Sequence, residues 1–182
     1  ELKKVANDLG LELFSTPFDF TAADFLDDMG VPVFKIASFE SSDPPLIEYV
    51  AGKGKPMMIS TGMAPLSQIE KAVDAATAGG AGENEVLLFK CSSAYPAPPS
   101  SMNLATIPHM ANAFDVPVGL SDHTLGWNIP VAAVALGACA VEKHVTLSRA
   151  DGGHDSAFSL EPDELRSMIE GIREIEQAIG SV

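Results

Sequence analysis

The chain has 182 residues, and its 46% hydrophobic and 20% charged residues are typical of a folded globular protein rather than of a disordered segment. Its formal net charge of −14 predicts a surface that repels nucleic-acid phosphates and anionic lipid headgroups, so we expect neither as a partner. The length is that of one domain, and no apolar run approaches the roughly 20 residues of a membrane span.

The chain begins ELKKVANDLG, a pattern typical of an amphipathic helix and not of a signal peptide. We therefore expect a cytoplasmic location, and we infer that the chain is a piece of a longer protein or lacks its true start. The two cysteines, Cys91 and Cys139, stand in apolar runs that resemble buried strands. This placement favours two small buried thiols over a disulfide.

Apolar runs of strand type alternate with helical patterns along the chain. Residues 64–78 have helical spacing and stop at Gly79-Gly80. The last predicted helix starts at Pro162, and its expected buried stripe is Leu165, Met168, Ile169, Ile172 and Ile175. The expected strands are continuous apolar runs, as in a parallel sheet covered by helices: Leu11–Ser15, Val33–Ile36, Pro56–Ser60, Glu85–Cys91, Val116–Ser121 and Cys139–Thr146.

Polar residues at the ends of these strands favour a barrel over an open sheet. Six strand–helix units in 182 residues leave about 30 residues per unit, which suits a (β/α)8 barrel and a doubly wound sheet equally well. An open sheet gathers its site at one switch point, whereas nearly every strand here ends in polar residues, at 15–17, 38–40, 60–62, 91–93, 121–124 and 142–144. We therefore expect an α/β fold, an incomplete (β/α)8 TIM barrel of about six βα units.

Two histidines, His123 and His144, stand at the ends of consecutive strands. Strand alternation puts Ser121 on the face of His123 and Glu142 on the face of His144. If both faces point inward, the two imidazoles converge, with a hydroxyl and a carboxylate beside them. That set suits a divalent metal with positions left for water or substrate, and the alternative is two histidines in ordinary hydrogen bonds.

Lys35 stands inside the otherwise apolar strand VFKIAS. A buried lysine is costly unless it is paired, so we expect it to reach an anion or a carboxylate. The alternative is a side chain that extends into solvent at a strand edge. Several hydroxyls at loop starts each suit a turn or a helix cap, and together they suit carboxylate or phosphate oxygens: Ser15, Thr16, Ser38, Ser60 and Ser121.

Two loops carry further candidates. Tyr95 lies in a stiff, proline-rich loop, where it either packs or binds. The glycine-rich loop at 149–156 either folds over the site as a lid or connects to the last helix as solvated chain.

A set of motifs in a fixed order resembles the sialic acid synthase family, whose members condense phosphoenolpyruvate with an amino-sugar aldehyde. The resemblance runs over essentially the whole chain, and within the family the loop SRADGGHDSAFSLEP is most similar to the bacterial pseudaminic acid synthases. The motifs are STPFD (15–19), FKIAS-x-E (34–40), STGM (60–63), KCSSAYPAP (90–98), GLSDHTLG (119–126), VAAVALGA (131–138), VEKH-x-TL (141–147) and SLEPDEL (159–165).

The resemblance implies a (β/α)8 barrel followed by a small antifreeze-like (SAF) domain that caps the partner's active site in a homodimer. On this basis residues 1–182 are the C-terminal three-quarters of the barrel, strands three to eight. The first two βα units, which carry a glutamate and a lysine of the family's site, and the SAF domain are then absent from this chain. We expect the chain alone to be inactive.

The resemblance also implies roles for individual residues. His123 and His144 would hold a divalent metal, Mn²⁺ or Mg²⁺. Glu40 and Asp155 would hold the sugar, with Tyr95 beside the reacting groups. The residues implied to bind phosphoenolpyruvate are Thr16, Lys35, Ser38, Ser60, Ser93 and Ser121. Two positions depart from the pattern, since Ser93 stands where some members have asparagine and His154 stands where we expect proline.

The implied reaction joins phosphoenolpyruvate, 2,4-diacetamido-2,4,6-trideoxy-L-altrose and water to give pseudaminic acid and phosphate. The first alternative keeps the family and changes the product to N-acetylneuraminate or legionaminate. A second is another metal-dependent barrel aldolase or hydrolase that uses the same histidine pair without phosphoenolpyruvate. A third is an inert barrel segment.

Overall fold

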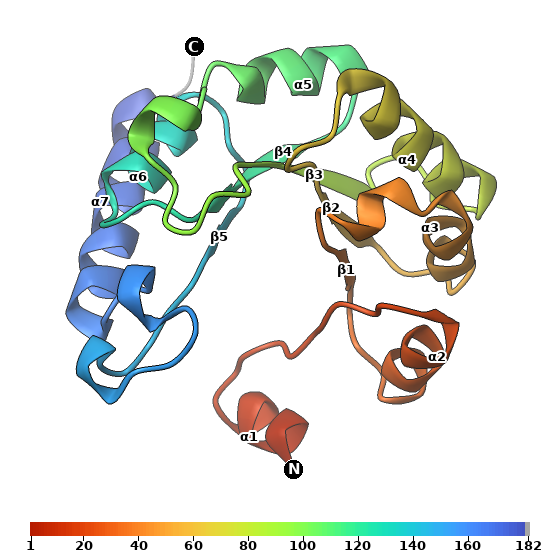
Figure 1. Cartoon of the computed structure of the whole chain (residues 1–182), viewed down its shortest axis with the longest axis horizontal. Coiled ribbons are helices and arrows are strands. Elements are labelled where there is room, and N and C mark those ends of the chain that lie inside the picture. Colours follow the sequence, from red (N-terminus) through yellow and green to blue (C-terminus); the bar gives the residue numbers. More distant parts are fainter. Residues whose placement is uncertain (181–182) are drawn as a thin grey trace. The chain divides into compact units, whose positions relative to one another are not determined.

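The computed structural model describes residues 1–180, in which helices and strands alternate (Figure 1). The chain divides into two compact units, Glu1–Leu88 and Phe89–Val182, and the boundary falls inside β3.

The strands are β1 (Phe34–Ile36), β2 (Met57–Ser60), β3 (Val86–Cys91), β4 (Val118–Asp122) and β5 (Val141–Lys143). The α-helices are α1 (Leu2–Asp8), α2 (Phe20–Asp28), α3 (Pro44–Ala51), α4 (Leu66–Ala78), α5 (Thr106–Phe114), α6 (Asn128–Ala135) and α7 (Pro162–Ile179). Short 3-10 segments are η1 (Glu40–Ser42), η2 (Pro99–Ser101), η3 (Arg149–Asp151) and η4 (Ser156–Phe158).

The strands are hydrogen-bonded in chain order, β1-β2-β3-β4-β5. The pairs β1–β2 and β4–β5 are parallel, as the continuous apolar runs predicted. The described chain contains five strands, so the prediction of six was wrong at Leu11–Ser15. The Ser15 carbonyl accepts a hydrogen bond from the Lys35 amide at 3.3 Å, and one such bond beside β1 does not make a ladder.

In the first unit, local sequence signals start the helices. The Asp19 side chain accepts the Ala22 amide at the start of α2, and Asp43 caps α3 ahead of Pro44. The helix predicted over 64–78 begins at Leu66, because Pro65 has an extended backbone. Helices α3 and α4 pack against each other (Figure 1). The fully buried core of this unit includes Phe34, Ile36, Leu46, Ile47, Met57 and Ile59.

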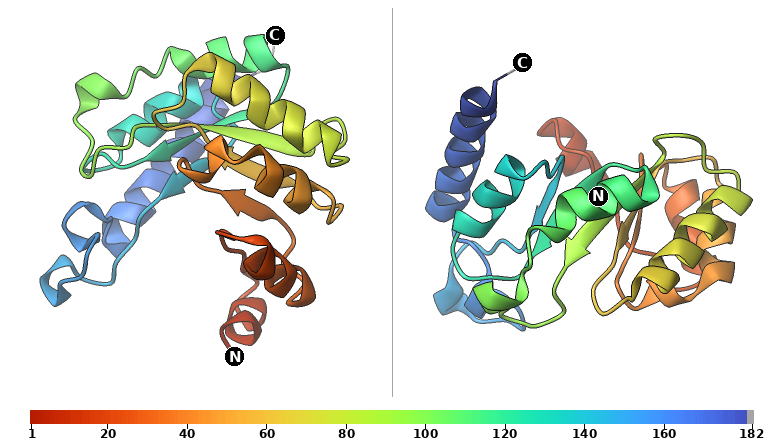
Figure 2. Two further views of the ribbon diagram at one scale, coloured as in Figure 1. Left: turned by 45° about the vertical axis from the view of Figure 1, so that its right-hand side comes forward. Right: turned by 90° about the horizontal axis from the view of Figure 1, so that it is seen from above.

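In the second unit, α5 and α6 pack on β4, and α6 lies beside α7 (Figure 2). The predicted start of α7 at Pro162 is confirmed, with a reciprocal capping box between Glu161 and Glu164. The predicted stripe is only partly buried, because the contact with α6 covers part of it. Met168 is buried, whereas Ile169 is 47% exposed.

The cysteines differ from each other in burial. Both are free thiols, and Cys91 is buried in β3 as predicted. The prediction for Cys139 was wrong, because this residue precedes β5 and is exposed. Among the described residues, no helix is both long enough and apolar enough to cross a membrane.

Candidate active site

The carboxyl ends of β1 and β2 bring Lys35 and Ser60 together in the first unit. The register places Lys35 opposite Met58, and the Lys35 side chain is buried, with 7% of the residue exposed. Its Nζ donates to Ser60 Oγ at 2.7 Å and to the Ile36 carbonyl at 3.2 Å. These contacts rule out the alternative of a lysine that extends into solvent.

Ser38, two residues after the end of β1, also belongs to this group. The Gly62 amide donates to Ser38 Oγ at 3.1 Å, which ties the end of β1 to the loop after β2. The Ser38 hydroxyl therefore uses a lone pair in this bond and keeps its proton for a further acceptor. We call Lys35, Ser38, Ser60 and Gly62 the lysine cluster.

Glu40 and Thr16 are the remaining candidates in the first unit. Glu40 lies in η1, and its Oε2 is a buried oxygen without a hydrogen-bond partner among the described residues. Such an atom carries the full desolvation cost of a polar group, so it marks a place where a bound ligand would supply the missing donor. Thr16 is half-buried in the loop ahead of α2.

In the second unit, the rings of His123 and His144 lie 5.3 Å apart between centroids. The parallel register explains this approach, since Ser121 pairs with Glu142 and Asp122 with Lys143. His123 and His144 are the residues that directly follow β4 and β5. The geometric part of the prediction, that the two imidazoles converge, is therefore confirmed.

A backbone carbonyl orients the ring of His123, which is 4% exposed. Its Nδ1 lies 2.9 Å from the Ser92 carbonyl and 3.9 Å from Cys91 Sγ. Because a carbonyl only accepts, Nδ1 is the protonated nitrogen in this contact. Nε2 is then the nitrogen with a free lone pair for a metal, as in many metal-binding histidines.

His144 is held near a carboxylate, with Nδ1 3.6 Å from Asp155 Oδ2. Burial lowers the pKa of His144 below 6.5, and the neighbouring His123 lowers it further, while Asp155 acts in the opposite direction. The net direction keeps this imidazole neutral at pH 7, which is the form that binds metals.

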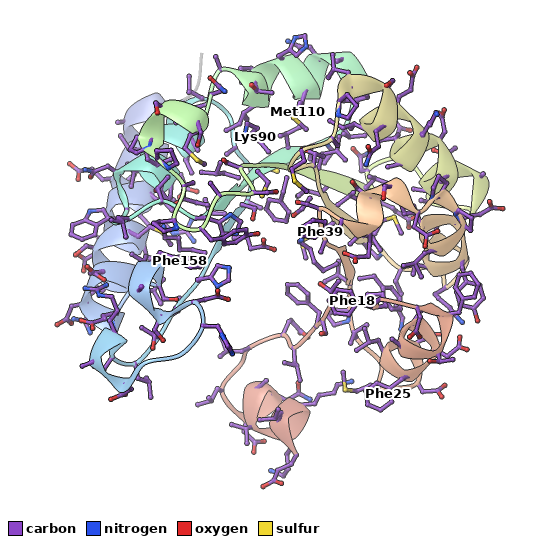
Figure 3. All side chains as sticks on the ribbon, in the orientation of Figure 1. Phe18, Phe25, Phe39, Lys90, Met110 and Phe158 are labelled. Atoms are coloured by element: carbon purple, nitrogen blue, oxygen red, sulfur yellow. The ribbon has the colours of Figure 1, made fainter. Side chains whose placement is uncertain are left out.

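Two aromatic rings complete what we call the histidine cluster, which consists of Tyr95, His123, His144 and Phe158. Tyr95 packs on His123 with ring centroids 4.2 Å apart, and Phe158 packs edge-on against His144 at 5.1 Å. Phe158, in η4, is buried (Figure 3). Tyr95 is 51% exposed, so it packs on one side and remains open on the other. Partial burial raises the pKa of Tyr95, with smaller contributions from Cys91, Glu142 and Asp155.

The two serines expected to bind phosphoenolpyruvate in this unit differ. Ser121 is buried and donates to Glu142 Oε1 at 2.7 Å, so its proton already serves a carboxylate. Ser93 Oγ is a buried oxygen without a partner among the described residues. A bound ligand could supply the missing hydrogen-bond partner.

The donor set of the histidine cluster fits a metal with open coordination positions. No group of three or more His, Cys, Asp or Glu residues suited to a metal occurs within residues 1–180. His123 and His144 alone would supply two imidazole nitrogens and leave the other positions to water or substrate oxygens. Two nitrogen donors fit Mn²⁺ better than Mg²⁺, which prefers oxygen ligands.

Sequence reasoning missed two features of this site. Lys143 Nζ forms a buried ion pair with Asp122 Oδ2 at 2.6 Å, directly before the two histidines. Opposite charges at paired positions of neighbouring strands were a usable signal for it. The contact of Phe158 with both histidine rings had no such signal, because it depends on the path of the loop after β5.

The order of the strands and the polar residues at their ends define a parallel α/β fold of TIM-barrel type. A truncated 3-deoxy-D-arabino-heptulosonate 7-phosphate synthase from Thermotoga maritima shares this fold, with a TM-score of 0.85 at 14% identity over 98% of this chain and 71% of that one. Residues 1–182 match the NeuB family throughout, and the chain belongs to this family. The resemblance predicted from the motifs is thus confirmed at the level of the family.

Relatives within the family make different products. The chain is 41% identical to N,N'-diacetyllegionaminic acid synthase of Campylobacter jejuni, over 99% of the chain and 54% of that protein. It is 37% identical to pseudaminic acid synthase of Helicobacter pylori, over 99% of the chain and 52% of that protein. A crystal structure of N-acetylneuraminic acid synthetase from Leptospira borgpetersenii matches with a TM-score of 0.94 and 34% identity, over 99% of the chain and 62% of that one. The chain spans about half the length of these two curated synthases, from Campylobacter jejuni and Helicobacter pylori.

Proposed function

We propose that the complete protein condenses phosphoenolpyruvate with an amino-sugar aldehyde and water to give a nine-carbon 2-keto acid and phosphate. The observation that carries this proposal is the 5.3 Å approach of His123 and His144 in a chain of the NeuB family. Relatives at 37–41% identity are named as synthases of such acids, which supports the same reaction class here.

The lysine cluster binds phosphoenolpyruvate in this proposal. Lys35 is a buried cation whose Nζ donates to Ser60 Oγ, and this ammonium group provides a charge-assisted hydrogen bond to an anionic group of the substrate. Ser38 has a hydroxyl proton to donate, and Ser93 Oγ has no partner of its own among the described residues. The family resemblance of the motifs, and not a contact between the two units, is the ground for assigning Thr16, Ser93 and Ser121 to the same substrate. Ser121 would have to give up its hydrogen bond to Glu142 in order to donate to this substrate.

The family resemblance assigns Glu40 of the first unit and Asp155 of the second unit to the sugar. Glu40 Oε2, which has no partner among the described residues, accepts a sugar hydroxyl or amide, and the exposed Asp155 beside His144 accepts another. Tyr95 packs on His123 with one side of its ring, and its exposed other side limits the position of the aldehyde.

Charge balance is the main catalytic contribution of the protein in this mechanism. His123 and His144 would hold a divalent cation, which when bound supplies Lewis-acid polarisation of the aldehyde oxygen. The methylene carbon of phosphoenolpyruvate attacks the aldehyde carbon, and water adds to the cationic carbon that results. Phosphate then leaves by cleavage of its C–O bond. Lys35 and the serines stabilise the phosphate and carboxylate charges through these steps.

In this proposal, the loop at 148–158 determines which sugar the enzyme accepts. Its sequence favours 2,4-diacetamido-2,4,6-trideoxy-L-altrose, and hence pseudaminic acid, as the first candidate. The precursor of legionaminate is the second candidate, because identity to a legionaminic acid synthase is 41%, against 37% for the pseudaminic acid synthase of Helicobacter pylori. We further propose a cytoplasmic homodimer whose eight-stranded barrel is completed by strands other than the five that the structure describes, and is followed by a SAF domain.

The test uses the complete protein with Mn²⁺, phosphoenolpyruvate and, separately, the sugar precursors of pseudaminate, legionaminate and N-acetylneuraminate. Phosphate release and the mass of the keto acid are measured together. We expect phosphate and keto acid in equal amounts with one preferred sugar. Sugar cleavage without phosphoenolpyruvate would support an aldolase or hydrolase instead. No turnover with any of the three sugars would contradict the proposal.

A further inference from the structure

A buried ion pair joins β4 to β5 one residue before each histidine. Lys143 Nζ lies 2.6 Å from Asp122 Oδ2, and the two side chains are only 3% and 0% exposed. Asp122 and Lys143 are direct partners in the parallel register. The pair therefore spans the two strands at the last position before His123 and His144.

Lys143 also binds the residue that follows His123. Its Nζ donates to the Thr124 carbonyl at 2.5 Å, while Asp122 accepts the Thr124 amide at 3.1 Å and the Thr124 hydroxyl at 3.0 Å. One ammonium group thus ties together the residues on both sides of His123. The same lysine directly precedes His144, so the backbone at both histidines depends on this one network.

The opposite face of the strands carries a second cross-strand bond. Ser121 donates to Glu142 at 2.7 Å, one register step before the ion pair. Successive side chains of a strand point to opposite faces, so β4 and β5 are joined on both faces just ahead of the histidines. A slip of one strand past the other would break both bonds and separate the two rings.

We infer that Asp122 and Lys143 are a positioning pair that holds the two imidazoles at the spacing needed to bind one cation. This inference rests on the proposed function in one respect, since it takes His123 and His144 as metal ligands. A buried ion pair is a poor source of stability, because the desolvation of its charges offsets their attraction. Its directional hydrogen bonds to Thr124 suit it better to fixing local geometry.

The test measures Mn²⁺ binding to the metal-stripped complete protein, from the electron paramagnetic resonance signal of free Mn²⁺. The variants are Asp122→Asn and Lys143→Met, which keep side-chain size and remove one charge each. The control is Ile107→Ala, a core truncation on α5 that lowers stability without removing a group of the network. Circular dichroism establishes that each variant is folded at the temperature used.

We expect each single variant to weaken Mn²⁺ binding by about 10- to 100-fold, the usual range for outer-sphere partners of metal ligands. Ile107→Ala is expected to lower the melting temperature and to keep the Mn²⁺ affinity within about threefold of wild type. Single variants that are folded and bind Mn²⁺ as wild type does would overturn the inference. An equal loss of affinity in Ile107→Ala would also overturn it, since general destabilisation would then explain the effect.

A single variant leaves one buried charge without its partner, which can prevent folding. In that case the neutral double variant Asp122→Asn/Lys143→Met is measured by the same criteria. The binding assay contains neither phosphoenolpyruvate nor sugar, so a protein that binds Mn²⁺ but makes no keto acid still tests the pair. A wild-type protein that binds no Mn²⁺ would overturn this inference together with the metal part of the proposed function.

Discussion

The imidazole rings of His123 and His144 come within 5.3 Å of each other because they follow paired positions on two parallel strands. His123 Nδ1 contacts the Ser92 carbonyl, and His144 Nδ1 faces Asp155. In each ring the other nitrogen is left for a shared ligand. This relationship underlies the metal proposal and the first prediction.

Replacement of either histidine by alanine should remove Mn²⁺ binding and turnover while the protein stays folded. Each ring supplies one of only two nitrogen donors in the histidine cluster, so one substitution halves the donor set. Isothermal titration with Mn²⁺ and a turnover assay measure the effect. His109→Ala is the matched control, because His109 is exposed on α5. Full activity in His123→Ala or His144→Ala would refute the metal assignment.

Lys35→Met should raise the KM for phosphoenolpyruvate far more than the KM for the sugar. Loss of a charge-assisted hydrogen bond costs roughly 1.5–3 kcal/mol, or about 10- to 150-fold. Methionine keeps the packing of the buried stem, so the fold should survive. Lys55→Met provides the comparison, since Lys55 pairs with Asp27 at 2.5 Å within the same unit. An equal rise of both KM values would mean that Lys35 has a structural role only.

Glu40→Gln should weaken sugar binding without loss of stability. The buried Oε2 has no partner among the described residues, and an unsatisfied buried polar group costs about 1–3 kcal/mol. Removal of the negative charge should leave the free energy of unfolding unchanged or raise it, while the KM for the sugar rises. Urea denaturation and steady-state kinetics give the two values. A destabilised variant with an unchanged KM is the opposite pattern and would assign Glu40 to the fold.

Lys90→Met should stabilise the protein at pH 7 and lose this advantage as the pH approaches 10.5. Burial lowers the pKa of Lys90 below 10.5, so the folded state disfavours its charge. At pH 7 the lysine is charged in both states and the cost is present. Between the lowered pKa and 10.5, the folded state releases the proton before the unfolded state does, so the wild type recovers stability. Lys90, labelled in Figure 3, donates to the Cys91 carbonyl and lies outside both clusters.

Thermal unfolding of wild type and Lys90→Met across pH 7 to 10.5 measures this effect. A difference in melting temperature that stays constant over the range would show that packing, and not the charge of Lys90, separates the two proteins.

The sequence predicted the parallel strands and the pairing of the two histidines, because both depend on short-range patterns. Continuous apolar runs identify buried strands, and alternation along a strand tells which residues share a face. These two patterns are enough to place His123 and His144 together from the sequence. The capped start of α7 at Pro162 was predicted for a similar reason, since capping residues act within one turn.

Features that depend on neighbours in space were predicted less well. The run Leu11–Ser15 has strand composition but makes no ladder, and Ile169 has the right spacing but is half exposed. Composition and spacing say what an element can bury, and only its neighbours determine what it does bury. For the same reason the contact of Phe158 with His144 was not foreseen.

The most direct test of the account is a crystal structure of the complete protein with Mn²⁺ and phosphoenolpyruvate, with anomalous diffraction data to locate the manganese. We predict an anomalous peak roughly 2.0–2.3 Å from a ring nitrogen of His123 and of His144. The anionic groups of phosphoenolpyruvate should lie within hydrogen-bond distance of Lys35. Manganese bound elsewhere would contradict the assignment of the histidine cluster, and phosphoenolpyruvate bound away from Lys35 would contradict the assignment of the lysine cluster.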